Sequence, residues 1–398
     1  MKTVRVLHII PSLSPQDGGP SAALLVMAQG LVQQGIGVTI ATTDPNSTVS
    51  KRENGIDYIY FHRSTRFYKI SFQLTDWLRK HITDFDVVHI HALFSYSSVV
   101  AGFIARSQQI PYIIRPLGVL NQWGMKNRRR ILKRLSLQLI ELPILRCATK
   151  IHYTSRAEAQ EASRAHPAIG ALPSIVIPLA IDTDAVHQPI GSREFLDKYP
   201  EASGKSIVLF LSRVDPKKGI ELLLNAFSEV HKKVPDAMLV IAGEGRADYA
   251  RSLRVKTNDL GISKHVLWTG FLRGSEKEAA LAAASVFVLP SFSENFGIAG
   301  LEALKAGVPT VLSDQVALSE EVGKADAGVV VPCEAAPLAT AILQLLYSRD
   351  LRDRVSANAR RLAKERFSRT NVARALKDLY MDCCRAKVPR SRALVRNL

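Results

Sequence analysis

Apolar residues in this chain gather in short continuous runs, and the stretches between these runs repeat their apolar residues with helical spacing. In the first half the runs predict strands at 4–10, 37–43, 86–91, 111–116, 150–155 and 174–180. In the second half they predict strands at 206–213, 237–243, 265–271, 285–290, 309–313 and 327–332. Helical spacing appears between them, for example at 21–34 and 96–108. Continuous apolar strands that alternate with helices are typical of parallel sheets covered on both faces, so we expect an α/β protein.

The alternation is interrupted at 187–205, where proline, glycine and charged residues replace it. We therefore expect two doubly wound, Rossmann-like domains facing a cleft, at 1–186 and 206–369, with 187–205 as the linker. Residues 370–398 begin helically and end in a basic tail. Ligands of doubly wound sheets bind at the carboxyl ends of the strands, which predicts a site in the cleft.

The composition fits large buried cores, because 47% of the 398 residues are hydrophobic and only 22% are charged. The four cysteines show no metal-binding spacing and fit a reducing cytosol. The start, MKTVRVLHIIPSL, is too short and too strand-like for a signal peptide. No uninterrupted apolar run reaches the ~18–20 residues of a membrane span. These features predict a cytoplasmic protein.

The stretch SFSENFGIAGLEAL (291–304) carries two glutamates eight residues apart, Glu294 and Glu302. We expect a helix to begin near Phe296 or Gly297, with Asn295 as its cap. The free amides of such a helix end form an anion site suited to phosphate, and Gly297 lets a ligand approach the backbone. Carboxylates beside a phosphate accept hydrogen bonds from hydroxyls, so the pattern favours a nucleotide sugar. The alternative is a capped helix with two solvated acids.

A second stretch, FLSRVDPKKG (210–219), ends a predicted strand with Arg213 and places Lys218 five residues later. Two cations at a strand-to-helix turn can neutralise a diphosphate, although surface charge is the alternative interpretation. Glycines also follow two other predicted strands. Gly18 and Gly19 come after a loop and directly before a helix, and Gly243 ends the strand in IAGEGRADY. They can line the same site, or form plain turns, because neither nucleotide-binding glycine motif is complete.

Together these stretches resemble the retaining glycosyltransferases of family 4, which have the GT-B fold. SENFGIAGLEAL matches the family's E-x7-E motif, and Arg213, Lys218, the early Gly-Gly and EALKAGVPTVLSD (302–314) agree in order and spacing. The resemblance covers nearly the whole chain and is strongest over 206–332. It implies no metal and no cofactor other than the nucleotide-sugar co-substrate, and a C-terminal helix that packs back on the N-terminal domain.

The resemblance also implies residue roles. Arg213 and Lys218 would stabilise the departing diphosphate, Glu302 would bind the ribose hydroxyls, and Glu294 would contact the donor hexose. The remaining donor-binding positions implied by the resemblance are Gly18, Gly19, Gly243, Phe271, Leu272, Asn295, Phe296, Gly297 and Ile298.

One departure concerns the first domain, where many relatives have a histidine in a Pro-His-Gly or Thr-x-His turn. The comparable turn here, RPLG (115–118), has Leu117. We consider His91 a candidate catalytic residue in its place, with a strand-end histidine of structural role as the alternative. On the acceptor side we expect Arg115, Asn121 and Trp123.

The segment 123–150 combines six Lys and Arg residues at 126–134 with Ile131, Leu135, Leu139 and Leu142 at helical spacing. The net charge of +17 also lies mainly in the first half and the tail, with +9 at 1–185 and +5 at 371–398. A basic amphipathic helix predicts that 123–146 contacts an anionic membrane surface. An ordinary helix with solvated charges is the alternative. Nucleic acid is not expected as a partner, because no nucleic-acid module is recognised.

The sequence thus predicts a retaining hexosyltransferase, peripheral on the cytoplasmic face of the plasma membrane. It would move a hexose from a nucleotide-diphosphate sugar to a saccharide or lipid-linked acceptor in surface polysaccharide or glycolipid synthesis. The alternatives are a nucleotide-sugar epimerase or a phosphorylase on the same fold, or a catalytically inactive membrane-associated partner subunit.

Overall fold

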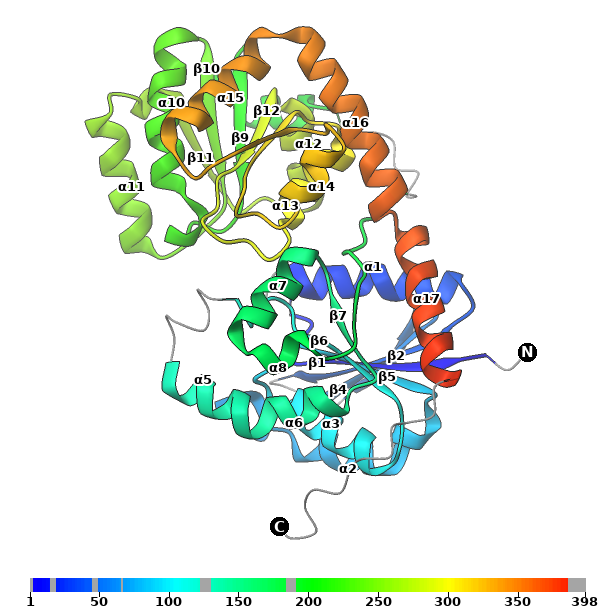
Figure 1. Ribbon diagram of the computed structural model, residues 1–398. Coiled ribbons are helices and arrows are strands. Elements are labelled where there is room, and N and C mark those ends of the chain that lie inside the picture. The colour runs from blue at the N-terminus through cyan, green and yellow to red at the C-terminus, as the bar shows by residue number, and fades with distance from the viewer. Residues whose placement is uncertain are drawn as a thin grey trace. The chain divides into compact units, whose positions relative to one another are not determined.

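The computed structural model describes residues 3–14, 19–44, 49–65, 67–121, 130–183 and 191–385. The chain forms two compact units (Figure 1). Unit 1 comprises Met1–Ala180 and Arg369–Leu398, and unit 2 comprises Ile181–Ser368. No described helix is both long enough and apolar enough to cross a bilayer.

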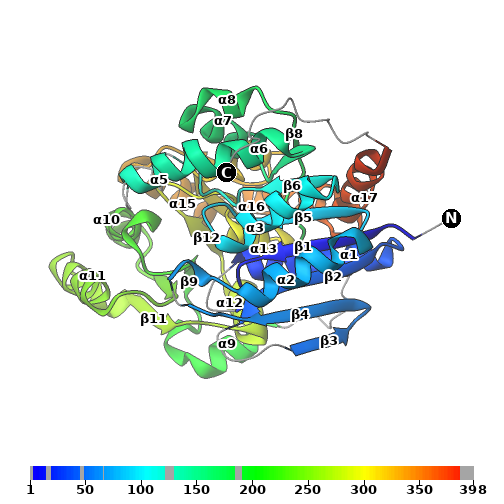
Figure 2. The ribbon, with the colours of Figure 1, turned by 90° about the horizontal axis from the view of Figure 1, so that it is seen from below.

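The sheet of unit 1 has eight strands in the order β3-β4-β2-β1-β5-β6-β7-β8, most of which Figure 2 shows side by side. Its strands are β1 (Arg5–Ile10), β2 (Gly37–Asp44), β3 (Val49–Glu53), β4 (Ile56–His62), β5 (Val87–His91), β6 (Tyr112–Arg115), β7 (Lys150–Tyr153) and β8 (Ser174–Val176). All neighbours pair in parallel except β3 with β4. The order reverses between β1 and β5.

Strands β3 and β4 were not among the predicted strands. The sequence of β3, VSKRE, is polar and every residue is exposed, because it lies at the edge of the sheet. In β4, IDYIYFH, buried and partly exposed residues alternate in place of a continuous apolar run. Neither the polar edge strand β3 nor its neighbour β4 has the continuous apolar run by which buried parallel strands are recognised.

Helices cover both faces of this sheet. They are α1 (Gly19–Gln33), α2 (Phe72–His81), α3 (Tyr96–Ser107), α5 (Arg130–Ser136), α6 (Leu142–Cys147), α7 (Arg156–Ala165), α8 (Pro167–Gly170) and α17 (Arg369–Arg385), with short turns η2 (Phe67–Lys69), η3 (Ile82–Asp84) and the π-helical η4 (Leu137–Glu141). The C-terminal helix α17 packs against α1 in Figure 1.

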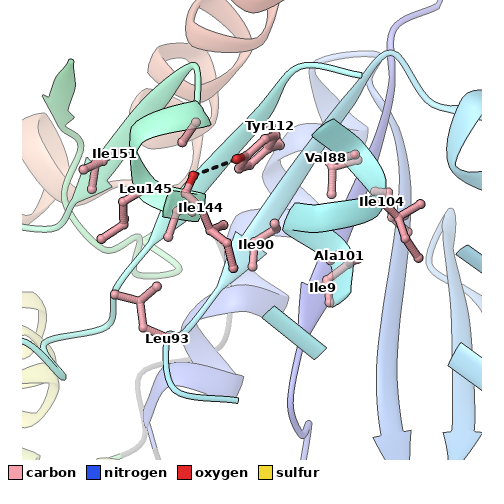
Figure 3. Close-up of a cluster of buried hydrophobic side chains, with 14 of the residues drawn as sticks. Ile9, Val88, Ile90, Leu93, Ala101, Ile104, Tyr112, Ile144, Leu145 and Ile151 are labelled. Carbon is pink, nitrogen blue, oxygen red and sulfur yellow. Dashed lines mark hydrogen bonds between the residues drawn. The ribbon is translucent and has the colours of Figure 1, made fainter. Parts of the chain in front are cut away.

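The alternation of side chains along the strands separates two cores. Leu7 and Ile9 of β1 pack with α3 and α6 on one face, where the hydroxyl of Tyr112 donates to the carbonyl of Ile144 at 2.6 Å (Figure 3). Val6 and Ile10 pack with α1 and α17 on the other face. Both faces of the sheet are therefore buried under helices, as expected of a parallel sheet.

Unit 2 has six parallel strands in the order β11-β10-β9-β12-β13-β14. They are β9 (Ser206–Leu211), β10 (Ala237–Ala242), β11 (Val266–Gly270), β12 (Val286–Leu289), β13 (Thr310–Ser313) and β14 (Val329–Val331). Its helices are α9 (Arg193–Lys198), α10 (Ile220–Lys233), α11 (Ala247–Asp259), α12 (Gly274–Ala283), α13 (Ile298–Ala306), α14 (Ser319–Lys324), α15 (Ala335–Tyr347) and α16 (Arg349–Phe367), with turns η5 (Pro200–Ala202), η6 (Pro216–Lys218) and η7 (Ser263–His265). The order reverses between β9 and β12.

The segment predicted as a linker is partly structured. Its residues 184–190 lie outside the described part of the chain. Residues 193–202 form α9 and η5, which belong to unit 2. Phe195 is buried, and Lys198 forms an ion pair with Glu276 of α12. Burial of Phe195 against unit 2 explains why these residues fold with it.

Candidate functional site

The sheet of unit 2 places the predicted donor residues where its strand order reverses. Strand β9 lies between β10 and β12, so the loops that follow β9 and β12 leave the same edge in opposite directions. Ligands of doubly wound sheets bind at this point. The loop 212–219 carries Arg213 and Lys218, and the loop 290–297 carries Glu294.

Local backbone geometry fixes Lys218. The carboxylate of Asp215 accepts from the amide of Lys217 at 3.0 Å and begins the turn η6. Gly219 follows with φ of +67°, and a Cβ there would lie 2.1 Å from the carbonyl oxygen of Pro290. The amide of Phe292 donates to the carbonyl of Lys217 at 2.9 Å. The two loops are thereby joined, and the Lys218 side chain is directed toward the loop after β12.

Glu294 meets Lys218 in an ion pair. The amide of Glu294 donates to the carbonyl of Gln315, and its carbonyl accepts from Ala317, both at 3.1 Å. The loop after β12 is thus also fixed to the loop after β13. The Lys218 side chain is 8% exposed and that of Glu294 is 20% exposed. Most of this ion pair is withdrawn from water, but the carboxylate of Glu294 can be reached by a ligand. A ligand can therefore replace one member of the pair as the partner of the other.

The helix predicted at this site, α13, begins at Ile298, and Gly297 precedes it with φ of +93°. A Cβ at Gly297 would lie 2.8 Å from Cγ1 of Val316, so this tight turn requires glycine. The predicted cap, Asn295, was wrong, because α13 has no side-chain cap among the described residues and the left-handed glycine turns the chain into the helix. Phe296 is buried against Phe367. The first amides of α13 therefore remain available to an anion.

Glu302 lies in the second turn of α13 and has a partner that the sequence did not reveal. Its carboxylate accepts from Nζ of Lys277, on α12, at 2.5 Å. Both side chains are about one quarter exposed, at 23% and 28%. The two residues are 25 positions apart, and no local spacing links them. A partly exposed carboxylate with one cationic partner keeps free lone pairs for a ligand's hydroxyls.

The remaining predicted donor residues of unit 2 lie on neighbouring strand ends. Phe271 follows β11 and is 52% exposed, with the guanidinium of Arg273 5.1 Å from its ring centroid. Leu272 is buried. Gly243 follows β10, and a Cβ there would lie 1.8 Å from the Ser212 carbonyl oxygen. Arg213 is exposed after β9. These residues line one edge of the sheet, but the described contacts join only Lys218 and Glu294 directly.

The candidates of unit 1 are placed differently. Gly19 begins α1, after β1, while Gly18 and Trp123 lie outside the described residues. Asn121 is buried. Leu117 has φ of +60°, a strained conformation for leucine. The amide of the next residue, Gly118, donates to Oε1 of Glu158 at 2.7 Å.

His91 and Arg115 lie in a buried polar network between the sheet and α17. His8 Nδ1 and His91 Nε2 are 2.9 Å apart, and His89 bonds both His152 (3.2 Å) and the hydroxyl of Tyr380 (2.8 Å). His91 is 0% exposed and Arg115 is 1% exposed. Both residues lie among the buried side chains of this network, so the geometry assigns both to the interior.

Burial dominates the electrostatics of this network. It lowers the pKa of His8 to about 3, helped by the Arg115 guanidinium, and lowers the pKa of His152 to about 3. The pKa values of His89 and His91 also lie well below 6.5, because burial and then neighbouring charges oppose their protonation. The rings are therefore neutral at pH 7.

The nitrogens of His8, His89 and His91 lie within 4.8 Å of one another, which is close enough for a metal ion. His89 already uses both ring nitrogens in hydrogen bonds, and His91 and His8 bond each other. The buried Arg115 adds positive charge, and within the described part of the chain no carboxylate belongs to the cluster. A metal ion would lie beside the buried Arg115 guanidinium without a carboxylate ligand of its own, so we interpret the cluster as a hydrogen-bonded network.

Two family models match consecutive parts of the chain. The model described as "Glycosyl transferase 4-like domain" matches residues 18–179, and "Glycosyl transferases group 1" matches residues 192–362. The phosphatidyl-myo-inositol mannosyltransferase of Mycobacterium tuberculosis is 33% identical over 214 residues, 52% of this chain and 53% of that protein. The GDP-mannose-dependent alpha-(1-6)-phosphatidylinositol monomannoside mannosyltransferase of the same organism is 33% identical over 182 residues, which are 44% of this chain and 47% of that protein. The chain spans about half the length of these curated relatives.

Solved structures share the fold over nearly the whole chain. Sucrose-phosphate synthase from Thermosynechococcus elongatus has a TM-score of 0.75 at 22% identity, covering 95% of this chain and 98% of that one. HepE of Anabaena in complex with UDP and glucose has a TM-score of 0.75 at 16% identity, covering 95% and 99%. The prediction of two doubly wound α/β domains is confirmed. With both family models matched in order along the chain, the protein belongs to the glycosyl transferases that these two models describe.

Proposed function

We propose that the protein is a retaining hexosyltransferase whose donor is a nucleotide-diphosphate sugar bound at the edge of unit 2. The observation that carries this proposal is the Lys218–Glu294 pair beside the free N-terminus of α13, at the point where the strand order reverses. Lys218 and Arg213 supply positive charge for a leaving diphosphate. Glu294 and Glu302 supply acceptors for hydroxyls on either side of it.

In the proposed reaction, the bond between the sugar's anomeric carbon and the diphosphate oxygen breaks, and the acceptor oxygen bonds to that carbon from the same face. The acceptor's proton passes to the leaving phosphate. Negative charge grows on the diphosphate as the bond breaks, so fixed cations stabilise the transition state more than the bound donor. No metal and no cofactor besides the nucleotide sugar is part of this proposal.

The relatives' names suggest which substrates to test first. Two of them are mannosyltransferases that act on phosphatidylinositol lipids, and one is named as GDP-mannose-dependent. We therefore propose a lipid or lipid-linked saccharide as the acceptor, on the cytoplasmic face of a membrane, and GDP-mannose as the first donor for trial.

The role of Glu302 can be tested by binding alone. Calorimetry with UDP, GDP and ADP is expected to find one nucleotide that binds best, and Glu302→Ala is expected to weaken it roughly tenfold or more, the value of a hydrogen bond to a charged group. The 2′,3′-dideoxy form should bind wild type and Glu302→Ala alike. Glu320→Ala, which removes a glutamate paired with Lys324 of α14, is the control. If Glu302→Ala weakened the binding of the dideoxy nucleotide as much as that of the ordinary nucleotide, Glu302 would not contact the ribose hydroxyls.

We further propose that α5 and η4 contact an anionic membrane. Four apolar side chains of this segment are largely exposed: Ile131 (74%), Leu132 (61%), Leu135 (53%) and Leu139 (70%). Lys133 and Arg134 lie among them. Apolar side chains at helical spacing beside lysine and arginine fit the boundary between lipid headgroups and acyl chains.

Replacing Leu132, Leu135 and Leu139 together by serine is expected to reduce binding to phosphatidylglycerol-containing vesicles about 100-fold. Each leucine loses roughly 1 kcal/mol or more of apolar transfer energy at the interface. Cosedimentation with vesicles measures the loss. Val255→Ser, a similarly exposed apolar residue on α11, is the control and should bind as wild type. If the triple variant bound these vesicles as tightly as wild type, the proposal that α5 and η4 contact the membrane would be wrong.

A further inference from the structure

A buried carboxyl lies beneath the loop that follows β5. Glu141 is the last residue of η4 and is 0% exposed. Its Oε1 accepts from the amide of Phe94 at 3.1 Å, and its Oε2 has no hydrogen-bond partner among the described residues. A carboxyl that is fully buried with one oxygen unused costs stability, so its presence calls for a role.

The loop that Glu141 holds is strained and lies at a ligand-binding position. Ala92 has φ of +96° and Phe94 has φ of +57°. Residues other than glycine rarely adopt such positive φ angles. The amide of Ala92 donates to the carbonyl of Arg115 at 2.9 Å. The loop is thus held from β6 at one end and from η4 at the other. It leaves β5 where the strand order of unit 1 reverses, which is where doubly wound sheets bind ligands.

The element that carries Glu141 joins the loop to the exposed helix α5. Helix α6 is fixed in the core through Ile144 and Leu145, as Figure 3 shows, whereas α5 at the other end is largely exposed. The π-helical turn η4 lies between them, and such turns occur frequently at functional sites. Lys133 of α5 also lies 6.0 Å from the ring centroid of Phe94. Both α5 and η4 therefore contact the loop.

We propose that Glu141 is a positioning residue for the acceptor. By holding the Phe94 amide, it keeps the loop 92–94 in the conformation that receives the acceptor, and through η4 it links that conformation to α5. The inference rests on the proposed transferase function. A purely structural Glu141 would affect folding without changing how the acceptor binds.

The protonation of Glu141 provides a second readout. Burial raises its pKa to about 7, although the Phe94 amide and the nearby Ser136 hydroxyl favour the carboxylate form. The other groups that face the carboxyl and its loop are Tyr68 of η2 and Lys133 of α5. A carboxylate accepts a hydrogen bond more strongly than a carboxylic acid. The acceptor KM of wild type is therefore expected to fall as pH rises through about 7.

The test compares Glu141→Ala and Glu141→Gln with wild type, and with Glu161→Gln of α7 as the control. The readouts are amide exchange of residues 92–96 and transfer from GDP-mannose to phosphatidylinositol in mixed vesicles. In Glu141→Ala we expect at least tenfold faster exchange of the loop and a tenfold higher acceptor KM, with donor hydrolysis unchanged. Glu141→Gln keeps an oxygen that can accept the Phe94 amide, so its loop exchange rate and acceptor KM should be close to those of wild type. Because glutamine does not titrate, this variant should not show the change in acceptor KM near pH 7.

Loop exchange that is the same in Glu141→Ala and wild type would overturn the proposal. So would faster exchange with an unchanged acceptor KM, because Glu141 would then be structural only. If wild type transfers nothing to this lipid, the exchange comparison of the alanine and glutamine variants decides whether Glu141 holds the loop. Failure of the proposed function has a different signature, since wild type would then neither bind nor hydrolyse any nucleotide sugar.

Discussion

Replacing Lys218 by alanine is expected to slow the release of nucleotide diphosphate from the donor by about 10²–10³-fold, the typical loss when one fixed group that stabilises transition-state charge is removed. Lys218 is 8% exposed, and its ammonium is aimed at the carboxylate of Glu294 beside the N-terminus of α13. A cation in this position needs no reorganisation when charge grows on the diphosphate. The loss should therefore appear in kcat more than in donor KM.

The neighbouring residue in the same turn, Lys217, provides the control for this experiment. Lys217→Ala removes the neighbouring charge while leaving the backbone contact between Phe292 and the Lys217 carbonyl in place. It should retain activity within a few fold. Equal losses in the two variants would show that general positive charge at this turn, and not the position of Lys218, supports the reaction.

Folding must be separated from catalysis in the Lys218 variants. Removing one partner of a buried ion pair leaves the other uncompensated and costs up to about 3–5 kcal/mol. Thermal unfolding of Lys218→Ala should therefore show a lower Tm, and Lys218→Met, which keeps the apolar stem, provides a second uncharged variant. A folded Lys218→Met protein with wild-type release would contradict the assigned role.

Acidification from pH 7 to pH 5 is expected to destabilise unit 1 strongly. His8, His89, His91 and His152 are buried and neutral, with folded-state pKa values depressed below the ordinary 6.5. Below pH 6.5 the unfolded chain binds protons that the folded chain does not, so stability falls as the pH falls. It continues to fall until the pH reaches the folded values, about 3 for His8 and His152.

The size of the acid effect follows from the number of rings. Each neutral histidine contributes a slope of about 1.4 kcal/mol per pH unit, and four contribute about 5 kcal/mol per pH unit. Glu141, whose pKa is raised to about 7 in the folded chain, opposes this slope and offsets about one of the four histidines. Typical domains have only about 5–15 kcal/mol in total. Arg115, charged in the same network, opposes protonation of the rings further.

Urea unfolding at pH 7, 6 and 5 measures this slope. His152→Gln should reduce proton uptake on unfolding by about one. Unfolding that takes up less than about one proton in this range would contradict a neutral buried network.

Much of the fold could be predicted because its central strands are continuous apolar runs. Strand β9, SIVLFL, is an example, and its neighbours in unit 2 follow the same rule. The hairpin of β3 and β4 was missed because neither strand has a continuous apolar run. The end of a strand also predicts the edge at which its loop residues gather, so Lys218 and Glu294 could be placed together in advance.

Contacts that depend on register or on helix packing could not be predicted. His8 and His89 are ordinary strand residues until β1 and β5 pair, and His91 meets Arg115 only through the pairing of β5 with β6. Lys277 reaches Glu302 across two helices. Asn295 looked like a helix cap because its residue type is common there, but the positive φ of Gly297 makes the turn instead.

The measurement that tests the account most directly is release of nucleotide diphosphate by the purified protein from UDP-, GDP- and ADP-sugars, with Glu294→Gln beside wild type. Glu294→Gln keeps the shape of the side chain and removes the charge that pairs with Lys218. We expect wild type to release nucleotide from one donor class and Glu294→Gln to lose most of that release. No release and no binding of any donor by folded wild type would contradict the assignment of this edge of unit 2 as the donor site.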